Sequence, residues 1–292
     1  MTQTTLFTHT DLDGVGCAVL FAATRPDHGP AHLVENGAID ERVSAAVADR
    51  MAAPAEHEVL VTDHGVSEDV AARIDAFVAA GGTFALLDHH RSSAHLASRP
   101  WATVDERRSA TGLLFQHLGR PPMLAEFVRL VEDHDLWLHR DERSARLAAL
   151  HGMLGHERFL ARFAANPEVR FSEGERLLLD VEQARRNAYL DKKVGQARVL
   201  ERGRVRWAVC YAEQHQSDLA ERMMNDLDVV ATAIVNTSKR TVSLRGRGYD
   251  VSTLAQRYGG GGHSRAAAFT FRDGPLEADL LRFERALDAA LG

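Results

Sequence analysis

Short apolar runs alternate with amphipathic segments through the first half of this 292-residue chain, and this alternation restricts the fold more than any other feature. The β-type runs lie at 4–8, 31–35, 58–62 and 83–87, and helical patterns follow the first three at 14–23, 40–50 and 67–80. Strands that alternate with helices pair in parallel through right-handed crossovers, which place helices on both faces of the sheet. We therefore predict an α/β fold with an N-terminal doubly wound, mainly parallel sheet.

A long, charged segment without proline divides the chain into two parts. Residues 109–163 are mostly helical in pattern, and Ser172 with Glu175 forms a capping box that predicts a helix over 173–200. Beyond it, strand patterns at 205–211, 229–235, 241–245 and 266–271 alternate with helical patterns at 217–226, at 251–258 and from Leu276 onward. We predict an N-terminal domain over 1–172, a linker helix over 173–200 and a smaller α/β domain over 201–292.

The composition excludes several classes of protein. With a net charge of −6 the chain is no basic nucleic-acid coat, and we expect no stable binding to long duplexes. No apolar run approaches the roughly 18 residues of a membrane span, and the first residues lack the pattern of a secretory signal. Cys17 and Cys210 offer neither a disulfide framework nor a paired zinc motif, and we interpret both as buried residues of a cytoplasmic protein.

Acidic and histidine residues follow three of the predicted strands directly. In chain order they are His9, Asp11 and Asp13, then Asp63, then Asp88, His89 and His90. Ligands of open α/β sheets bind beyond the carboxyl ends of the strands, so neighbouring strands would bring all three clusters to one rim. The alternate spacing of His9, Asp11 and Asp13 lets their side chains point to one side of an extended segment. Gly14 permits a tight entry into the following helix.

Carboxylates gathered in this way need positive charge between them. Several of them in close contact repel one another and lose water, so they would take up protons or force the rim apart. A pair of divalent cations removes this cost, and carboxylates with a few imidazoles suit Mn²⁺ or Mg²⁺, with the imidazoles favouring Mn²⁺. We expect two divalent ions, with Mn²⁺ preferred and Mg²⁺ or Co²⁺ as alternatives.

Each cluster by itself also has an ordinary structural interpretation. An aspartate at a strand end is often a helix N-cap or a turn former, and residues 88–90 would also fit a solvated loop. A fourth acidic segment carries Asp133 and Asp135 at the end of a predicted helix, and alone it indicates a polar helix end with Trp137 in the core. Acidic clusters at three successive strand ends favour a shared site over these separate interpretations.

The order and spacing of these motifs resemble those of the DHH phosphoesterases. The segment HTDLDG, Asp63, the run 88–90 and the segment with Asp133 and Asp135 correspond to the four motifs of that family. Residues 259–263 with 266–268 resemble the GGGH-type signature of the DHHA1 domain. The resemblance covers nearly the whole chain and is strongest to nano-RNases and to cyclic-dinucleotide phosphodiesterases. It implies a DHH domain followed by a DHHA1 domain.

The resemblance also implies a role for each residue of the N-terminal site. The implied ligands are His9, Asp11 and Asp63 for one ion, and Asp13, Asp63, His89 and a fourth-motif aspartate for the other. Asp63 would therefore bridge the two ions. Asp135 is the preferred fourth ligand because Asp-x-Trp resembles the nano-RNase pattern, and Asp133 is the alternative. Asp88 would orient the histidine pair, and His90 would face the scissile phosphate.

The C-terminal glycine run predicts a second site for an anion. Consecutive glycines let backbone N–H groups form an anion-binding nest, and a helix that begins near His263 would add its positive end. The candidate substrate-binding residues are Arg245, Gly260, Gly261, Gly262, His263 and Arg265. A flexible glycine hinge is the alternative. One anion site on each domain, with a cleft between them, favours a substrate of a few nucleotides.

Together these features predict a phosphodiester hydrolase that degrades short oligonucleotides and dinucleotides, linear or cyclic, to nucleoside monophosphates. One rival is a phosphatase acting on 3′-phosphoadenosine 5′-phosphate, and another is a manganese pyrophosphatase, which shares the metal motifs. A non-catalytic nucleotide sensor conflicts with the complete set of ligands. A homodimer is compatible with the sequence.

Overall fold

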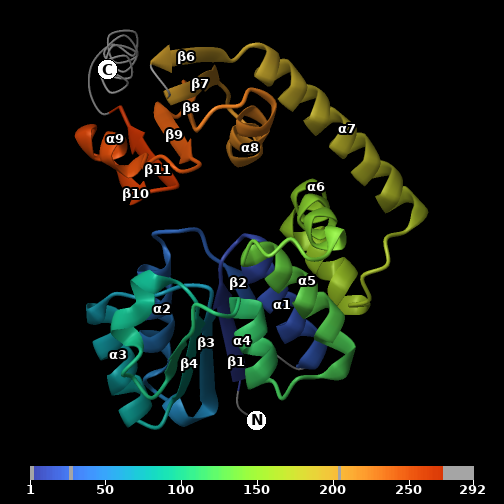
Figure 1. The fold of residues 1–292 in the computed structure, drawn as a ribbon. Coiled ribbons are helices and arrows are strands. Elements are labelled where there is room, and N and C mark those ends of the chain that lie inside the picture. The colour runs from blue at the N-terminus through green and yellow to red at the C-terminus, as the bar shows by residue number, and fades with distance from the viewer. Residues whose placement is uncertain (1–2, 26–28, 203–204, 272–292) are drawn as a thin grey trace. The chain divides into compact units, whose positions relative to one another are not determined.

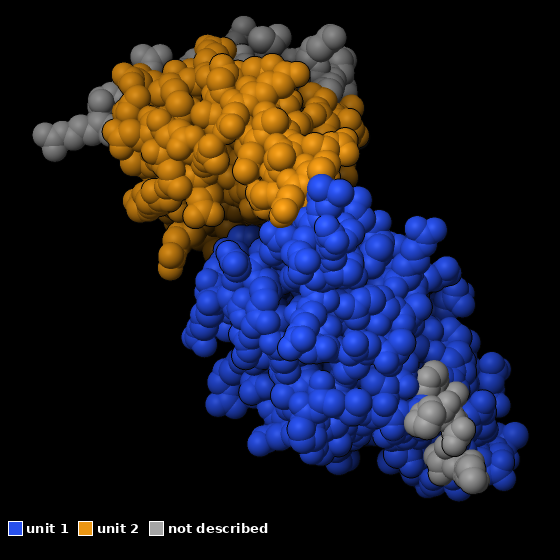
Figure 2. Space-filling view, turned by 90° about the vertical axis from the view of Figure 1, so that its right-hand side faces the viewer, with its two compact units in different colours: residues 1–179 blue, residues 180–292 orange. Residues whose placement is uncertain are grey.

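The structure is a computed structural model, and it describes residues 3–25, 29–202 and 205–271 (Figure 1). The chain divides into two compact units, residues 1–179 and 180–292, which Figure 2 shows in different colours. Within the described ranges no helix has the length and apolar character needed to cross a bilayer. The helix predicted from Leu276 lies outside the described residues.

A five-stranded parallel sheet in the order β2-β1-β3-β4-β5 forms the centre of the first unit. Its strands are β1 (Gln3–Thr8), β2 (Ala31–Leu33), β3 (His57–Thr62), β4 (Thr83–Asp88) and β5 (Ala102–Val104). β3 pairs with β1 on one side and with β4 on the other, so the three strands that precede the acidic clusters are neighbours. The four predicted strands are confirmed. The short edge strand β5 was not predicted.

Alternate strand residues belong to two hydrophobic cores, one on each face of the sheet. Leu6 and Leu60 pack against the helices α1 (Leu12–Thr24), α4 (Ala110–His117), α5 (Ala125–Asp135) and α6 (Glu142–Ala165). Phe7 and Val59 pack against α2 (Ile39–Arg50) and α3 (Glu68–Ala79) on the other face (Figure 1). Short 3-10 turns lie at Pro54–Glu56, Arg91–Leu96 and Pro122–Leu124. Burial on both faces explains the continuous apolar runs in β3 and β4, and the doubly wound α/β fold is confirmed.

The long helix α7 (Glu173–Gly195) begins at the predicted capping box. The backbone N–H of Ser172 donates to Oε2 of Glu175 at 2.6 Å, and the N–H of Glu175 donates to Oγ of Ser172 at 3.2 Å. The helix ends at Gly195 rather than at residue 200, because Arg198–Arg202 forms the strand β6 and pairs antiparallel with β7 (Val205–Tyr211). Pairing with the next strand along the chain outweighs the local helical pattern.

A six-stranded mixed sheet in the order β10-β11-β9-β8-β7-β6 forms the second unit. Its remaining elements are β8 (Ala231–Asn236), β9 (Thr241–Gly246), β10 (Gly261–His263), β11 (Ala266–Thr270), α8 (Gln216–Asp226) and α9 (Ser252–Arg257). Residues of α9 pack on one face with Leu244, and those of α8 on the other with Ile234. Apart from a helix expected near His263, the elements predicted within the described part of this domain are confirmed to within a few residues.

The expectation of a helix that begins near His263 is wrong. Residues 261–263 are the strand β10, which forms a hairpin with β11 and pairs His263 with Ala266. The glycines fit this hairpin because the backbone is crowded. A Cβ on Gly260 would lie 2.2 Å from the carbonyl oxygen of Ala268, and Gly262 has a φ of 135°. The glycine run thus permits close strand pairing, and it does not lead into a helix.

Candidate metal centre and substrate site

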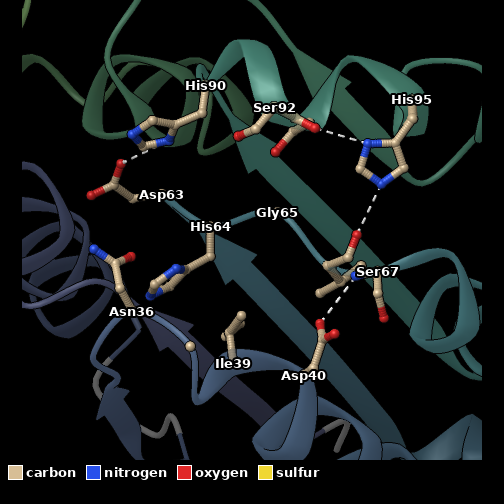
Figure 3. Close-up of a pocket in the computed structure, with 13 residues that line it drawn as sticks. Asn36, Ile39, Asp40, Asp63, His64, Gly65, Ser67, His90, Ser92 and His95 are labelled. Atoms are coloured by element: carbon tan, nitrogen blue, oxygen red, sulfur yellow. Dashed lines mark hydrogen bonds and ion pairs between the residues drawn. The ribbon is translucent and has the colours of Figure 1, made fainter. Parts of the chain in front are cut away.

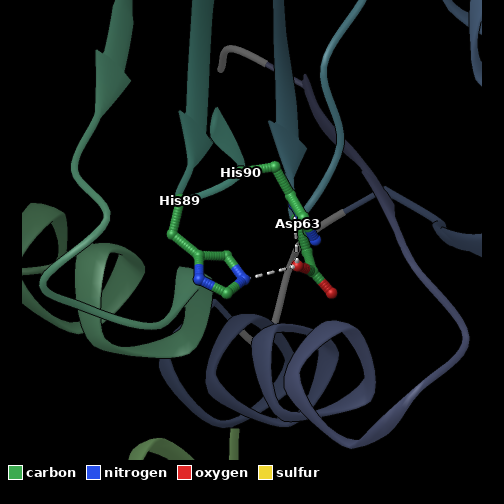
Figure 4. Close-up of side chains that lie close together, drawn as sticks. All are labelled: Asp63, His89 and His90. Atoms are coloured by element: carbon green, nitrogen blue, oxygen red, sulfur yellow. Dashed lines mark ion pairs between the residues drawn. The ribbon is translucent and has the colours of Figure 1, made fainter. Parts of the chain in front are cut away.

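Asp63 lies at the centre of the acidic rim, directly after β3. Its Oδ1 is 3.4 Å from Nε2 of His89 and 3.9 Å from Nδ1 of His90, both of which follow β4 (Figure 4). Its Oδ2 is 3.7 Å from Nδ1 of His9, which follows β1. The Asp63 backbone adopts a left-handed φ of 58°, which is uncommon for a residue other than glycine. Strained backbone of this kind is typical of functional sites.

The first predicted ligand set is brought together. One ligand atom each from His9, Asp11 and Asp63 lies within 4.8 Å of the others. Asp11 also caps α1, because its Oδ1 accepts from the N–H of Gly14 at 3.0 Å while its Oδ2 lies 3.0 Å from Nδ1 of His9. Asp11 therefore caps α1 and also lies in the cluster. A Cβ on Gly14 would lie 2.2 Å from the carbonyl oxygen of His9, so only glycine fits here.

The second predicted set also converges. Ligand atoms of Asp13, His89 and Asp135 lie within 4.8 Å of one another. Asp13 is buried in the first turn of α1, and its two oxygens accept from the backbone N–H groups of Ala110 and Thr111 at 2.6 and 2.9 Å. These donors form the N-terminus of α4, whose positive end favours the carboxylate. The sequence analysis missed this support, although Ser109 is a recognisable N-cap for α4.

The geometry separates the two candidate aspartates of the fourth motif. Oδ2 of Asp135 is 3.5 Å from Nε2 of His89, inside the cluster. Asp133 is buried, and it accepts hydrogen bonds from the backbone N–H groups of Arg140 and Asp141 and from Oγ of Ser144. Asp133 therefore holds the loop after α5, and the position of Asp135 favours it as the fourth ligand.

The carboxylates of the cluster lack compensating charge. Burial, together with the charges of Asp13 and Asp11, raises the pKa of Asp63 to about 12 and that of Asp135 to about 8. Both oxygens of Asp63 and Oδ2 of Asp135 are buried and accept no hydrogen bond from the described residues. Buried acceptors without donors are rare in proteins, and divalent cations would satisfy them. The donor set of carboxylates and imidazoles thus fits a pair of metal ions.

Asp88 is fully buried behind the two histidines. It accepts from the backbone N–H of His89 at 2.9 Å, and its Oδ1 lies 2.8 Å from Nδ1 of His90. Ser93 donates a further short hydrogen bond to its other oxygen. Burial alone would raise the pKa of Asp88, but these hydrogen bonds outweigh burial and lower the pKa. The hydrogen bond to Asp88 raises the pKa of His90, whose side chain is half exposed.

A pocket of about 400 Å³ opens beside this cluster, and Asp63 and His90 line one end of it (Figure 3). His64, which the sequence analysis did not single out, lies in its wall. Nε2 of His64 is 3.0 Å from the carbonyl oxygen of Val34, and its ring meets that of His9 edge to face at 5.0 Å. His64 therefore supports the orientation of His9 from outside the cluster.

In the second unit, Arg245 lies on the face of β9 that α8 covers. It donates to Oγ of Ser217 at 3.1 Å, near the N-terminus of α8. Burial lowers the pKa of its half-buried guanidinium, and no carboxylate of the described residues forms an ion pair with it. A half-buried cation that lacks an anionic partner is suited to a phosphate.

The sheet register places His263 in the same row as Arg245. Ala266 pairs with His263 on one side and with Arg245 on the other, so the three side chains share one face. Between the two longer side chains stands only the methyl group of Ala266 in this row. Arg265 is separate, because it lies in the turn between β10 and β11 and lines another pocket, of about 600 Å³.

Comparison with known proteins agrees with this arrangement. A family model described as the DHHA1 domain matches residues 208–291. The sequence is 32% identical to the oligoribonuclease NrnB of Bacillus subtilis (strain 168), over 92% of this chain and 73% of that protein. This chain belongs to the DHH/DHHA1 family of phosphoesterases. It is accordingly a phosphodiester hydrolase, and its DHHA1 match falls within the second unit.

Solved structures of DHH proteins share the fold. The pGpG-specific phosphodiesterase PggH from Vibrio cholerae matches with a TM-score of 0.59 and 14% identity, over 99% of both chains. The exonuclease RecJ bound to manganese matches with a TM-score of 0.55 and 18% identity, over 99% of this chain and 90% of RecJ. At these identities the likeness concerns the fold.

Proposed function

We propose that this DHH/DHHA1 protein is a metal-dependent phosphodiesterase that hydrolyses short oligonucleotides and dinucleotides to nucleoside monophosphates. Two divalent ions, preferably Mn²⁺, would be held by His9, Asp11, Asp13, Asp63, His89 and Asp135. The proposal depends on one observation, the burial of the Asp63 carboxylate without hydrogen-bond donors among the described residues. Both of its oxygens are buried and accept no hydrogen bond from the part of the chain that the structure describes, and they lie 3.7 and 3.4 Å from imidazole nitrogens that follow two different strands. Cations are the partners that this arrangement lacks.

The residues around the ions have separate tasks. Two bound ions would supply Lewis-acid chemistry, withdrawing charge from the phosphoryl oxygens and activating water. Asp88 holds Nδ1 of His90 and favours the protonated imidazole, which leaves Nε2–H to donate to a non-bridging phosphate oxygen. Asp13 is held at the N-terminus of α4, which fixes its carboxylate before any ion binds.

The second unit supports a short substrate. Arg245 and His263 share one face of the sheet, where they would bind a further phosphate or a terminal one. The similarity to NrnB, named an oligoribonuclease, points to the same class of substrate. The net charge of −6 disfavours long polyanions. The scarcity of cysteine fits an enzyme of the cytoplasm.

A panel of pure compounds tests this function. Purified protein with Mn²⁺ is incubated with a dinucleotide, a five-nucleotide RNA, a cyclic dinucleotide, 3′-phosphoadenosine 5′-phosphate and pyrophosphate, and products are resolved by chromatography. We expect the dinucleotide and the RNA to yield mononucleotides, and EDTA or Asp63→Asn to abolish the reaction. Asp69→Asn is the matched control, because Asp69 is an exposed aspartate in α3, away from the cluster. Faster release of phosphate from either of the last two compounds would overturn the proposal.

A further inference from the structure

The helix α5 ends with an unusual residue. The backbone N–H of Trp137 donates to the carbonyl oxygen of His134 at 3.1 Å, and the N–H of Leu138 donates to that of Asp133 at 2.9 Å. This is a Schellman ending, in which the residue at the position of Trp137 adopts a left-handed conformation and is usually glycine. Trp137 has a φ of 55°, so a bulky side chain occupies a backbone position that disfavours it.

Burial does not compensate for this strain. Trp137 is 58% exposed, whereas Trp101 and Trp207 are 7% and 1% exposed. The sequence-based alternative that placed Trp137 in the core is wrong. Its ring meets the edge of the exposed His139 ring, with the ring centroids 4.4 Å apart, and its centroid lies 6.4 Å from that of His134. His139 also has a left-handed φ, of 51°, so two aromatic side chains are presented from strained positions.

A buried carboxylate holds the loop in this shape. Asp133 accepts from the backbone N–H of Arg140 at 2.9 Å and from that of Asp141 at 3.3 Å, and Oγ of Ser144 donates to it at 2.6 Å. These bonds tie the residues after Trp137 to the helix before it. Strained backbone persists where the surroundings determine it, and such segments cluster at ligand sites.

The loop begins at the candidate metal centre. Trp137 follows Asp135 by two residues, so their Cα atoms are at most about 7 Å apart. The Asp135 carboxylate reaches 3.5 Å from Nε2 of His89 in the cluster. The backbone that carries the exposed indole is therefore close to the backbone of a residue that would hold the ions.

We propose that Trp137 is a stacking platform for a nucleobase of the substrate, and that Asp133 is the residue that positions it. The inference rests on the proposed function and extends it to substrate selection. Every base has a π-face, so an indole would bind bases of any sequence next to the cleaved phosphate. A stacked base would cover the Trp137 ring, which is exposed in the free enzyme.

Fluorescence tests the contact without turnover. Trp137 is the one exposed tryptophan of the three in the chain, and all three lie in the described part. Adenosine monophosphate added with Mg²⁺ should quench the exposed indole emission, and ribose 5-phosphate, which lacks the base, should not. Nucleotide binding seen by calorimetry with unchanged emission would overturn the proposal. This readout needs no hydrolysis, so it separates failure of the stacking role from failure of the proposed function.

Substitutions then separate stacking from a structural role. Trp137→Ala should raise the KM for a dinucleotide by about 5- to 150-fold, and Trp137→Phe should restore most of that loss. Leu138→Ala is the matched control, because Leu138 is the adjacent exposed apolar residue, and its KM should stay unchanged. Trp137→Gly should raise the KM like alanine while leaving the Tm unchanged or higher, since glycine relieves the strain. A lower Tm with unchanged KM would assign Trp137 to the fold, and a shift to a smaller species in sedimentation would assign it to a subunit contact.

Discussion

Replacing Asp63 by asparagine should make the metal-free protein more stable, although it removes the central group of the proposed site. Without ions, burial and the charges of Asp13 and Asp11 raise the pKa of Asp63 to about 12 from an ordinary value of 3.8. At neutral pH the folded protein therefore retains a proton on this carboxyl that the unfolded chain releases. Holding that proton costs free energy, which asparagine does not require.

The magnitude follows from proton linkage. A raised pKa contributes stability that is fully present below pH 3.8 and is lost as the pH rises toward the folded value. The loss is about 1.4 kcal/mol for each pH unit, or about 4 kcal/mol at pH 7. Asparagine has nearly the same shape and does not ionise. Asp63→Asn should therefore gain on the order of 2–4 kcal/mol in EDTA at pH 7, and progressively less at lower pH.

Urea unfolding at pH 5 and pH 8, in EDTA and in Mn²⁺, measures this effect. In EDTA the advantage of Asp63→Asn should grow between the two pH values. In Mn²⁺ the order should reverse, because ions at a hundredfold excess over their Kd stabilise the wild type by about 2.7 kcal/mol per site and the variant by less. Asp69→Asn should show neither effect. If Asp63→Asn is less stable than the wild type in EDTA, or its advantage is independent of pH, the carboxyl is ionised in the fold and the reasoning fails.

Three further substitutions test other parts of the site. Gly14→Ala places a methyl group 2.2 Å from the His9 carbonyl oxygen, so the ligand loop must shift. We expect the affinity for Mn²⁺, measured by calorimetry, to fall by about 10- to 100-fold. An unchanged affinity would show that the added methyl group does not displace the ligand loop. Asp133→Ala leaves its buried hydrogen-bond donors without an acceptor and should cost about 2–3 kcal/mol in urea unfolding, where a cost near zero would mean that water replaces the carboxylate. Arg245→Lys keeps the charge but loses the planar fork, and the KM for a dinucleotide should rise about tenfold. Arg247→Lys should have little effect, because Arg247 is exposed and donates to Oδ1 of Asn225 at 2.9 Å. Equal effects of the two lysine variants would show that charge alone matters.

The sequence by itself determined the strands, most helices and the chemistry of the rim. The strands β3 and β4 contain continuous apolar runs, β1 is rich in threonine and apolar residues, and helices of ordinary length follow β1 and β3. Local sequence patterns therefore identify these elements. The acidic clusters directly after β1, β3 and β4 converge because parallel strands direct their carboxyl ends to one edge. For these clusters the local sequence pattern and the order of the strands lead to the same result. The convergence of the acidic residues could therefore be predicted without knowledge of distant contacts.

Tertiary structure decided the features that depend on residues far apart in the chain. The Asp13 carboxylate meets the N-terminus of α4, whose first residues lie 97 and 98 positions away. Asp133 and Asp135 are alike in the sequence. Only packing decides that the Asp133 side chain points into the loop after α5, whereas the Asp135 side chain points toward His89. The glycine run pairs as an edge strand because its partner, β11, is itself held in the sheet by the earlier strand β9. Spacing along the chain records which groups are near in sequence, but the burial and pairing of each group are set by the elements that pack around it.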